Sequence, residues 1–304
     1  MDSHEANTRR IYEAQHKRIS ADDDATKRIV GQYDNTSFSI DPDWFRGKLA
    51  LDAGCGNIGG MIQKLHRLGV SKVIGIDLGS QWIDLLKANL HRAGLLPSAY
   101  ELTPGSALDI PFPDGFFDFV SINGVLIHLK TMEDVALGFA QGARKTRSGG
   151  YYFTSYGPCG GLVQGVIMRA LREHYRKDAD FKALIDTISP ETIHVAIEKI
   201  VADAHQHAGQ DLDAEFLTGL FGVDFCVFLQ NYIQAPTWWS NECTPAFVEG
   251  LYRQHGFTNI TRLNSFNKRT DIRKYFAPLH YDREYPLSKI LYGEGYVQYI
   301  AQKI

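Results

Sequence analysis

Residues 51–60, LDAGCGNIGG, combine a glycine-rich turn with an acidic residue just before it. The glycines Gly54, Gly56 and Gly59 have the spacing of a turn that brings the backbone close to a bound ligand. The apolar run KLALDA before the turn predicts a buried strand, and the residues after it predict a helix that ends at Gly69. A strand, a glycine turn and a helix in this order are typical of the first unit of an α/β sheet.

Strand-like and helix-like segments continue to alternate after this unit. Short apolar runs of strand type occur at residues 72–78, 116–123 and 151–157, and helical periodicity occurs at residues 80–94 and 133–150. Strands and helices that alternate at this spacing predict a parallel, doubly wound sheet. We therefore expect an α/β fold with a Rossmann-like sheet.

The alternation stops after Gly157, and helical periodicity dominates residues 162–229. One helix is expected to start at Pro190 with Ser189 as its cap. Strand-like segments return near the C-terminus. We expect four parts: an N-terminal helical cap (1–46), a Rossmann-like core that binds the cofactor (47–157), a helical insertion acting as a substrate lid (158–235), and returning helices and strands that complete the sheet (236–304). The alternative for the insertion is a dimerisation arm, which would make the protein a homodimer.

Composition and charge exclude several classes of function. The chain is 44% hydrophobic and 22% charged, and its net charge of -3 provides no basic surface for nucleic acid. No apolar run reaches the roughly 18 residues of a membrane span, and the N-terminus is too polar for a secretory signal. The four cysteines lie far apart, and the pair His205 and His207 lacks a third ligand, so no metal site is expected. We expect a cytoplasmic protein that acts on a small molecule and binds neither nucleic acid nor membrane.

Two acidic residues indicate which ligand the glycine turn holds. Asp52 lies beside the turn, where a carboxylate would repel a pyrophosphate but would favour a ligand with an ammonium group. Asp77 ends the second strand, about 20 residues after the glycines, where a carboxylate can accept hydrogen bonds from a ribose. S-adenosylmethionine has both groups. The alternatives are a buried acid that stabilises the turn for Asp52 and a helix cap for Asp77.

Three segments, LDAGCGNIGG, VIGIDLGSQWI and ALDIPFPDGFFDFVSINGVLIHL, together resemble the class I S-adenosylmethionine-dependent methyltransferases. The resemblance is to the group that includes the ubiquinone and menaquinone biosynthesis methyltransferases (methyltransferase type 11), and it covers residues 49–153. It implies a methyltransferase sheet with S-adenosyl-L-methionine as cofactor. The cofactor-binding residues that it implies are Asp52, Gly54, Gly56, Asn57, Asp77, Leu78, Trp82, Ser106, Ala107 and Asn123.

The resemblance assigns these residues to different parts of the cofactor. By the resemblance, Asp52 and the glycines surround the methionine part, Asp77 binds the ribose, and Asn123 faces the sulfonium. Trp82 or Leu78 packs against the adenine; the alternative for Trp82 is ordinary core. The chain departs from the family at Ser106, where the family usually has an acid that contacts the adenine.

His128 is the candidate catalytic base, because it follows the strand that ends near the sulfonium and a histidine pKa is ordinarily near neutrality. The alternative is a structural histidine at the strand end. The family often has a second histidine here, and this chain has Ile127 in its place.

The second half of the chain is rich in tyrosine and tryptophan, which suits a desolvated acceptor pocket. The basic residues Arg269, Arg273, Lys274 and Arg283 could hold a carboxylate. The main hypothesis is methyl transfer to an amino-acid-like or acidic metabolite at nitrogen or thioether sulfur. The alternative is an oxygen or carbon of a larger hydrophobic metabolite, such as a quinone, terpenoid or polyketide. The rivals are a non-catalytic methyltransferase-like binding protein and a nucleotide-sugar or nicotinamide enzyme.

Overall fold

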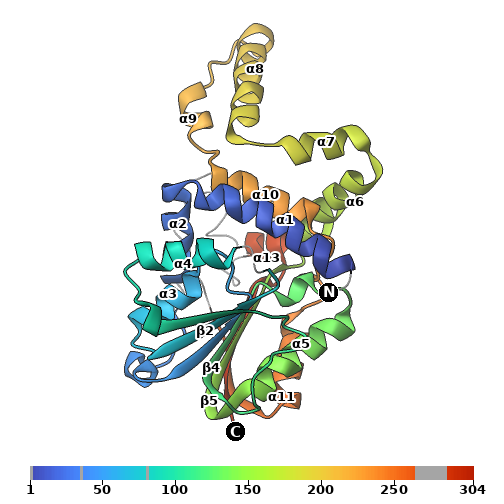
Figure 1. The fold of residues 1–304 in the computed structure, drawn as a ribbon. Helices are drawn as coiled ribbons and strands as arrows, with labels where there is room; N and C mark the ends of the chain where they lie inside the picture. The colour runs from blue at the N-terminus through green and yellow to red at the C-terminus, as the bar shows by residue number, and fades with distance from the viewer. Residues whose placement is uncertain (1–2, 35–36, 80–81, 264–285) are drawn as a thin grey trace.

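The structure is a computed structural model that describes residues 3–34, 37–79, 82–263 and 286–304. Seven strands of this described part form one sheet, in the order β3-β2-β1-β4-β5-β7-β6 (Figure 1). Strand β7 is antiparallel to both of its neighbours. The α/β fold with a doubly wound sheet is therefore confirmed. The strands are β1 (Leu49–Ala53), β2 (Lys72–Asp77), β3 (Tyr100–Pro104), β4 (Phe117–Asn123), β5 (Thr146–Cys159), β6 (Phe257–Arg262) and β7 (Gly295–Lys303).

Strand β3 is the one strand of this sheet that the sequence pattern did not predict. Its residues, YELTP, are half-buried or exposed because they lie at the edge of the sheet. An edge strand needs no continuous apolar run, so its sequence gives a weak signal.

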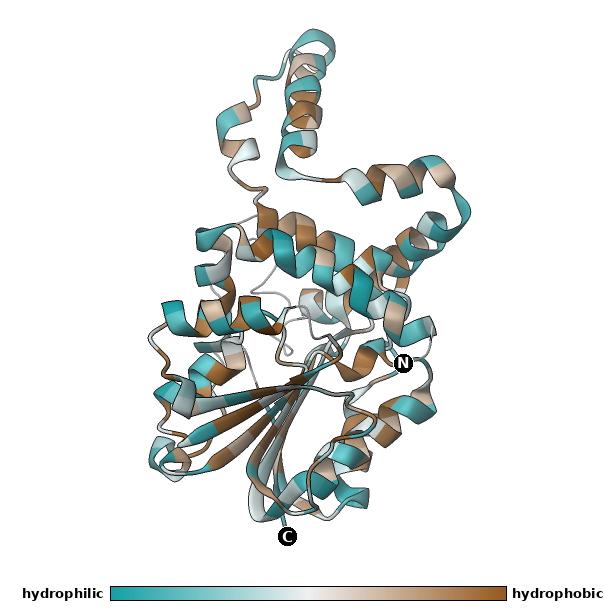
Figure 2. Cartoon of the chain, in the orientation of Figure 1, coloured by the Kyte–Doolittle hydropathy of each residue, from teal (hydrophilic) through white to brown (hydrophobic). Residues whose placement is uncertain are grey.

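Helices cover both faces of the sheet, whose middle strands are strongly hydrophobic (Figures 1 and 2). Alternate strand residues serve the two faces: Ala50 and Phe119 pack with α3 and α4, and Leu51 and Val120 pack with α5 and α11. The helix expected from residue 80 begins at Ile83. The helices on the faces are α3 (Gly60–Arg67), α4 (Ile83–Arg92), α5 (Met132–Lys145) and α11 (Pro245–Gln254), with the short η1 (Pro42–Phe45), η2 (Pro97–Ala99) and η3 (Leu126–His128) between elements.

Three helices, which we call the roof, lie above the carboxyl ends of the parallel strands (Figure 1). They are α1 (Ser3–Ser20), α2 (Asp23–Asp34) and α10 (Val223–Gln234). Two side-chain hydrogen bonds join α1 to α10: Gln15 Nε2 donates to Gln234 Oε1 (2.9 Å) and Arg18 donates to Gln230 Oε1 (2.6 Å). The N-terminal helix α1 and the last helix of the insertion, α10, thus pack together over the same edge of the sheet.

The predicted helical insertion consists of helices, and part of it projects from the molecule (Figure 1). Helix α8 starts at Pro190 with the capping box of Ser189, as predicted, and Gly209 ends it. We call residues 178–222 the arm. The elements between β5 and α10 are the π-helical η4 (Gly161–Met168), α6 (Arg169–Lys177), α7 (Ala179–Thr187), α8 (Pro190–Ala208) and α9 (Ala214–Thr218); α13 (Pro286–Tyr292) packs beside η4.

The turn after β1 requires glycine at position 54. Its φ is +83°, and a Cβ there would lie 2.1 Å from Cγ2 of Val125. The backbone N–H groups of Gly54 and Cys55 donate to the carbonyl of Ile76 at 2.7 and 3.2 Å, which holds the turn against β2. Position 54 therefore combines a left-handed backbone with a close approach between two loops.

Replacing Gly54 by alanine should lower the free energy of unfolding by about 2–5 kcal/mol, because a left-handed alanine and an overpacked site each add a penalty. Gly94 is a matched control, since its φ is also +83° but nothing lies within 4 Å of its Cβ position. Gly94→Ala should cost only about 1–2 kcal/mol. Urea unfolding of both variants measures the difference, and equal losses would contradict the close approach.

Candidate active site

A cavity of about 710 Å³ lies between the carboxyl edge of the sheet and the roof. Its volume is within the range of about 300–1,000 Å³ that is usual for small-molecule sites. It is lined by the loops after β1, β2 and β4 and by α1, α2 and α10. Nine of the predicted residues line it together: Gly54, Gly56, Asn57, Asp77, Leu78, Trp82, Ala107, Asn123 and His128.

Asp77 clamps the glycine turn. Its Oδ2 accepts a hydrogen bond from the backbone N–H of Gly56 (2.9 Å), and its Oδ1 accepts one from Leu78 (2.7 Å). Burial raises the pKa of Asp77 to about 6, and the two N–H groups oppose that rise. A carboxylate has room for about four hydrogen bonds, so Asp77 can still accept bonds from a ligand.

Asp52 and Ser106 are not among the residues that line the cavity. Asp52 is 2% exposed, and its neighbours in the sheet are Gly75 and Ser121. Burial raises the pKa of Asp52 to about 7. Tyr33 of α2 lines the cavity in its place, and burial together with the charge of Asp52 raises the pKa of Tyr33. Asp52 is an interior strand residue, because β1 runs on to Ala53, and it does not line the cavity. That its carboxylate borders the ligand stays a prediction.

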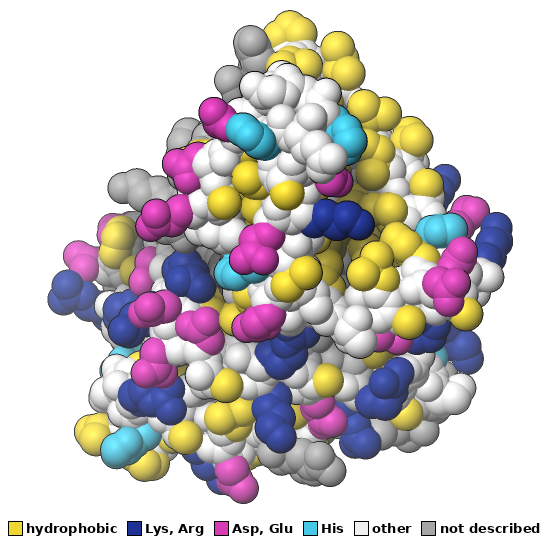
Figure 3. All heavy atoms as spheres, turned by 90° about the horizontal axis from the view of Figure 1, so that it is seen from above, with side chains coloured by type: hydrophobic (Ala, Val, Ile, Leu, Met, Phe, Trp, Pro, Cys, Tyr) yellow, Lys and Arg dark blue, Asp and Glu magenta, His cyan; other side chains and the backbone are white. Residues whose placement is uncertain are grey.

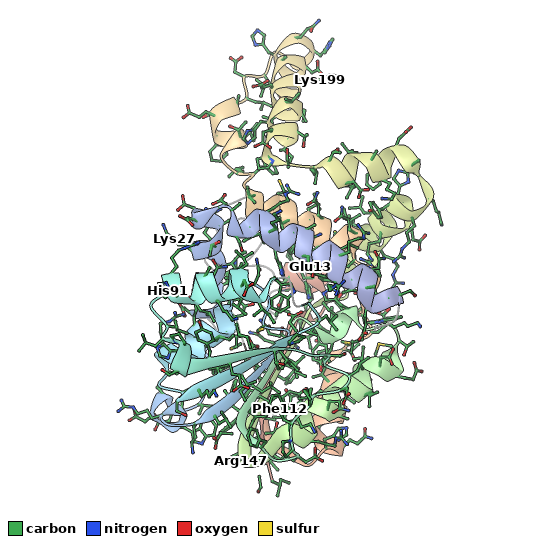
Figure 4. All side chains as sticks on the ribbon, in the orientation of Figure 1. Glu13, Lys27, His91, Phe112, Arg147 and Lys199 are labelled. Carbon is green, nitrogen blue, oxygen red and sulfur yellow. The ribbon has the colours of Figure 1, made fainter. Side chains whose placement is uncertain are left out.

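Helix α1 supplies polar groups that the sequence analysis did not identify. Figure 4 shows Glu13 on α1 above the sheet edge. A Cβ at Gly79 would lie 2.8 Å from Oε1 of Glu13 and 2.1 Å from Nε1 of Trp82, so these side chains converge beside the end of β2. Arg9 Nε lies 3.7 Å from Oε1 of Glu13. Ser106 Oγ donates to Glu5 Oε1 (3.0 Å), so Ser106 binds α1 in this structure.

Three polar atoms at this end of the cavity are buried and have no hydrogen-bond partner: Arg9 Nε, Glu13 Oε1 and Asn57 Oδ1. Asn57 Nδ2 is occupied, because it donates to the carbonyl of His16 (3.0 Å) and to Ser20 Oγ (2.6 Å). Arg9 Nε and Glu13 Oε1 are an ion pair at 3.7 Å, which is too long for a hydrogen bond. Buried polar atoms without a hydrogen bond are costly and rare in folded proteins. Together with the unused acceptor capacity of Asp77, these three atoms fit a polar ligand of the size and chemistry of an adenosine with an amino-acid tail.

His128 lies at the other end of the cavity, against α1. Its Nε2 is 2.8 Å from the hydroxyl of Tyr12, and its Nδ1 is 3.3 Å from the carbonyl of Thr237. Because a carbonyl only accepts, Nδ1 carries the proton and Tyr12 donates to Nε2. Burial lowers the pKa of His128 to about 3, a shift to which the charge of Arg172 adds. The pKa of His128 therefore lies well below the ordinary value of a histidine, because α1 covers this ring, which the sequence does not show.

Aromatic rings enclose this end. Trp238 lies 4.1 Å from the ring of Tyr232 and 5.0 Å from that of His128, between ring centroids. Trp238 Nε1, Asn231 Oδ1 and Thr8 Oγ1 are buried without a hydrogen-bond partner, and all three residues line the cavity. By contrast, Trp239 Nε1 donates to the carbonyl of Leu129 (2.7 Å). The acceptor end is thus mainly apolar, with a few polar atoms open to a ligand.

Arg172 of α6 places a positive charge behind this aromatic wall. It is buried and donates to the carbonyls of Tyr232 and Ala235, at the end of α10. Asn123, at the end of β4, accepts a hydrogen bond from Ser155 Oγ. Of the predicted insertion, only α10 contributes lining residues among those described, and the arm contributes none. The predicted basic residues Arg269, Arg273, Lys274 and Arg283 lie outside the described residues.

Neither a metal cluster nor a membrane helix is found in the part of the chain that the structure describes. Its His, Cys, Asp and Glu side chains form no group of three or more that could hold a metal ion. Its helices lack the combination of length and hydropathy that crossing a membrane requires.

Residues 51–154 match a family model described as a methyltransferase domain. Three similar proteins are a fatty-acid O-methyltransferase of Mycolicibacterium smegmatis (33% identical; 44% of this chain and 45% of the relative), a 24-methylenesterol C-methyltransferase 2 of Oryza sativa subsp. japonica (30%; 35% and 28%), and a demethylmenaquinone methyltransferase of Geobacillus stearothermophilus (30%; 34% and 43%). The chain thus spans less than half the length of each of these relatives.

Among solved structures, similarity is found to geranyl diphosphate methyltransferase in complex with SAM, with a TM-score of 0.44 and 15% identity over 92% of this chain and 86% of that one. A putative methyltransferase bound to the Trm112 activator of Haloferax volcanii has a TM-score of 0.46 and 11% identity over 98% and 94%. Such low scores carry no argument about function. The sequence matches confirm the resemblance, and the chain contains, in residues 51–154, a methyltransferase domain of the class I S-adenosylmethionine-dependent family, in which S-adenosylmethionine is the methyl donor.

Proposed function

We propose that this protein transfers the methyl group of S-adenosylmethionine to a carboxylate oxygen of a mainly apolar acid. The observation that carries the proposal is the acceptor end of the cavity. This end combines aromatic walls, a buried positive charge at Arg172 and polar atoms that lack a hydrogen-bond partner. It also contains His128, and burial lowers the pKa of this histidine to about 3. This setting favours an acceptor that is already an anion.

The cofactor end supports this proposal through residues that fit the donor. Asp77 would bind the ribose, the turn from Gly54 to Gly56 would border the amino-acid part, and Trp82 and Ala107 would border the adenine. Asp52 would act on the ammonium group through Tyr33, which lies between it and the cavity. When bound, the cofactor supplies an electrophilic methyl group. The protein's task is then to hold the acceptor in line and to exclude water.

The protonation state of His128 separates the possible acceptors. A phenol or a carbon acceptor must lose a proton, and a base is effective when its pKa is near the working pH. With a pKa of about 3 and an Nε2 already bound to Tyr12, His128 is a poor base at neutral pH. A carboxylate has lost its proton well below neutral pH and needs no base.

A hydrogen-bond donor at this end suits a carboxylate. Trp238 lines the cavity and its N–H has no hydrogen-bond partner, whereas the O–H of Tyr12 is already donated to Nε2 of His128. Burial raises the pKa of Tyr12 and lowers that of His128, and the positive charge of Arg172 lowers both. Arg172 thus makes the local potential more positive. The surrounding Val227, Phe228 and Tyr232 of α10 would cover an apolar chain or ring.

The named relatives support oxygen or carbon rather than nitrogen or thioether sulfur as the acceptor atom, because two of their names specify an O- and a C-methyltransferase. We therefore prefer the hydrophobic alternative to the amino-acid-like acceptor of the main sequence hypothesis. An apolar acid keeps one element of that hypothesis, the acidic acceptor group.

Incubation with S-adenosylmethionine carrying a deuterated methyl group, followed by mass spectrometry, tests the proposal. Fatty acids of graded chain length and aromatic acids should give methyl esters. At saturating cofactor the rate should be flat between about pH 7.5 and 9, because a carboxylate is fully ionised there. A rate that rises about tenfold per pH unit, or methylation of amines or thioethers only, would refute carboxylate methylation. Cofactor binding without turnover of any acceptor would favour the non-catalytic binding protein.

Replacing Asp77 by asparagine should weaken S-adenosylmethionine binding by about 1–3 kcal/mol, because hydrogen bonds to a charged acceptor are lost. The wild-type affinity should also fall as the pH drops below about 6, where Asp77 gains a proton, and the variant should lose most of this dependence. Titration calorimetry measures both effects. Asp84→Asn is the control, since that side chain is 93% exposed on α4 and should leave binding unchanged.

Replacing Trp238 by phenylalanine removes the unpaired N–H while keeping an aromatic ring. We expect kcat/KM for a carboxylate acceptor to fall about 10- to 100-fold, with cofactor affinity unchanged, because a hydrogen bond to a charged group is lost. Trp239→Phe should instead lower stability, since its N–H is bound to Leu129. An unaltered kcat/KM in the Trp238 variant would remove that N–H from acceptor recognition.

A further inference from the structure

The arm, residues 178–222, has almost no core of its own. Among its side chains, Ile185, Ile197 and Leu220 are buried. Its larger exposed hydrophobic residues include Val195, which is 66% exposed, and Ile200, which is 55% exposed. Figure 2 shows hydrophobic residues along α8, and Figure 3, which looks down on the arm, shows hydrophobic side chains gathered in a band at this end of the molecule. The exposed hydrophobic residues of the arm are Leu184, Val195, Ile200, Leu212 and Phe216.

A helical segment of this size needs a surface to pack against. Most of the stability of a helix in a protein comes from tertiary packing of its apolar face, and the arm buries few hydrophobic side chains of its own. Residues on α8 such as Lys199 stand far from the cavity (Figure 4), and the arm contributes nothing to the cavity lining among the described residues. The apolar faces of the arm are therefore not explained by the active site.

The charge of the arm indicates what covers it. Residues 178–222 carry nine acidic and two basic side chains, a formal charge of -7, so the rest of the chain, whose total is -3, carries +4. The body is basic where the arm leaves it: besides the buried Arg172, α6 has Arg169, Arg176 and Lys177 against one acid, Glu173. An arm this acidic would be repelled by an anionic membrane and attracted by the body of a second copy.

The body also has an exposed apolar surface beside α6, which we call the body patch. It is formed by Leu162, Val166 and Ile167 of η4 with Leu287 and Ile290 of α13. These two elements are in close contact, since a Cβ at Gly161 would lie 2.4 Å from the backbone nitrogen of Gly293. Charged groups around the patch are Arg169, which is paired with Glu242 at 3.6 Å, and Lys289. The chain thus carries an acidic arm with exposed apolar residues and an apolar patch that adjoins the basic helix α6, and these two surfaces are complementary.

We propose that the protein is a two-fold homodimer in which the arm of each copy packs on the body patch of the other. A two-fold arrangement makes both contacts at once and closes the assembly. It buries the two exposed hydrophobic groups of each chain and sets the acidic arm against basic α6. This inference does not depend on which acceptor the enzyme methylates.

Light scattering coupled to gel filtration, with sedimentation equilibrium, tests the proposal on the full chain. The wild type should have twice the mass of one chain at micromolar concentration. The arm variant Val195→Gln/Ile200→Gln and the patch variant Val166→Gln/Ile290→Gln should each raise the dimer dissociation constant about 100-fold or more, because each removes two buried aliphatic side chains per contact. Leu96→Gln, a substitution at a 70% exposed leucine before η2, is the matched control and should stay dimeric.

Mixing the two variants tests whether arm meets patch. A heterodimer would have one intact contact, formed by the arm of the patch variant on the patch of the arm variant, so the mixture should dimerise more tightly than either variant alone. Higher salt should weaken the wild-type dimer, as opposite charges are screened. Circular dichroism and S-adenosylmethionine binding check that each variant is folded.

Three results would overturn the proposal. The first is a monomeric wild type at about 50 µM, well above the affinity range of specific interfaces. The second is an arm variant that dimerises as well as the wild type. The third is a monomeric wild type whose arm binds vesicles of neutral phospholipid and loses that binding in the arm variant, which would identify a lipid surface as the partner.

Discussion

The contact between the glycine turn and the end of β2 is the constraint around which the site is built. The carbonyl of Ile76 receives two backbone N–H groups of the turn, and the carboxylate of Asp77 receives a third, from Gly56. The same residue thus shapes the loop and presents the ligand-binding group. Asp77 can do both because a carboxylate has more lone pairs than the two N–H groups use. Burial makes ionisation of Asp77 more difficult, and these N–H groups reduce that penalty.

Helix α1 makes one site out of two halves. Glu13 faces the end of β2, and Tyr12, the preceding residue, contacts His128 at the end that we assign to the acceptor. A single turn of helix therefore borders both halves of the cavity. This helix also removes His128 from water, which accounts for its low pKa. The same contact therefore covers the acceptor end of the cavity and makes His128 a poor base, as the proposed transfer to a carboxylate allows.

The sequence reveals local structure well because local structure depends on neighbouring residues. The turn at Gly54, the cap at Ser189 and the buried strands follow from spacing and hydrophobic pattern, and the structure confirms them. Strand β3 is missed because an edge strand has little apolar pattern. The site is predicted only in the segments that follow the strands, where the topology fixes the position of a residue. Tyr33 and Glu13 are missed, and Trp238 is expected only as one of many aromatic residues of the second half, because nothing in a helix or loop sequence states which distant element it will cover.

The same reason explains why the sequence does not predict the ionisation of the site. The sequence identifies Asp52 and His128 as titratable, but their pKa values depend on burial by partners that are remote in the chain. His128 is covered by Tyr12, 116 residues away, and by Thr237, 109 residues away. The assignment of the substrate-lid and acceptor-binding parts stays a prediction for a related reason: the lid expected from residues 158–235 lines the cavity only through α10 among the residues described.

Helix α10 links the acceptor end to the proposed dimer. It follows the arm directly in the chain, lines the cavity through Phe228 and Tyr232, and is bound by α1 through Gln230 and Gln234. Arg172 of α6, the helix that precedes the arm in the chain, donates to the carbonyls at the end of α10. An arm held on a partner would restrict both chain segments that reach α10 and so fix the aromatic wall before an acceptor binds. A preorganised wall costs less on binding than one that must be ordered by the ligand. The apolar residues of the arm, which are exposed in a single chain, would then stabilise the geometry of the site as well as the dimer.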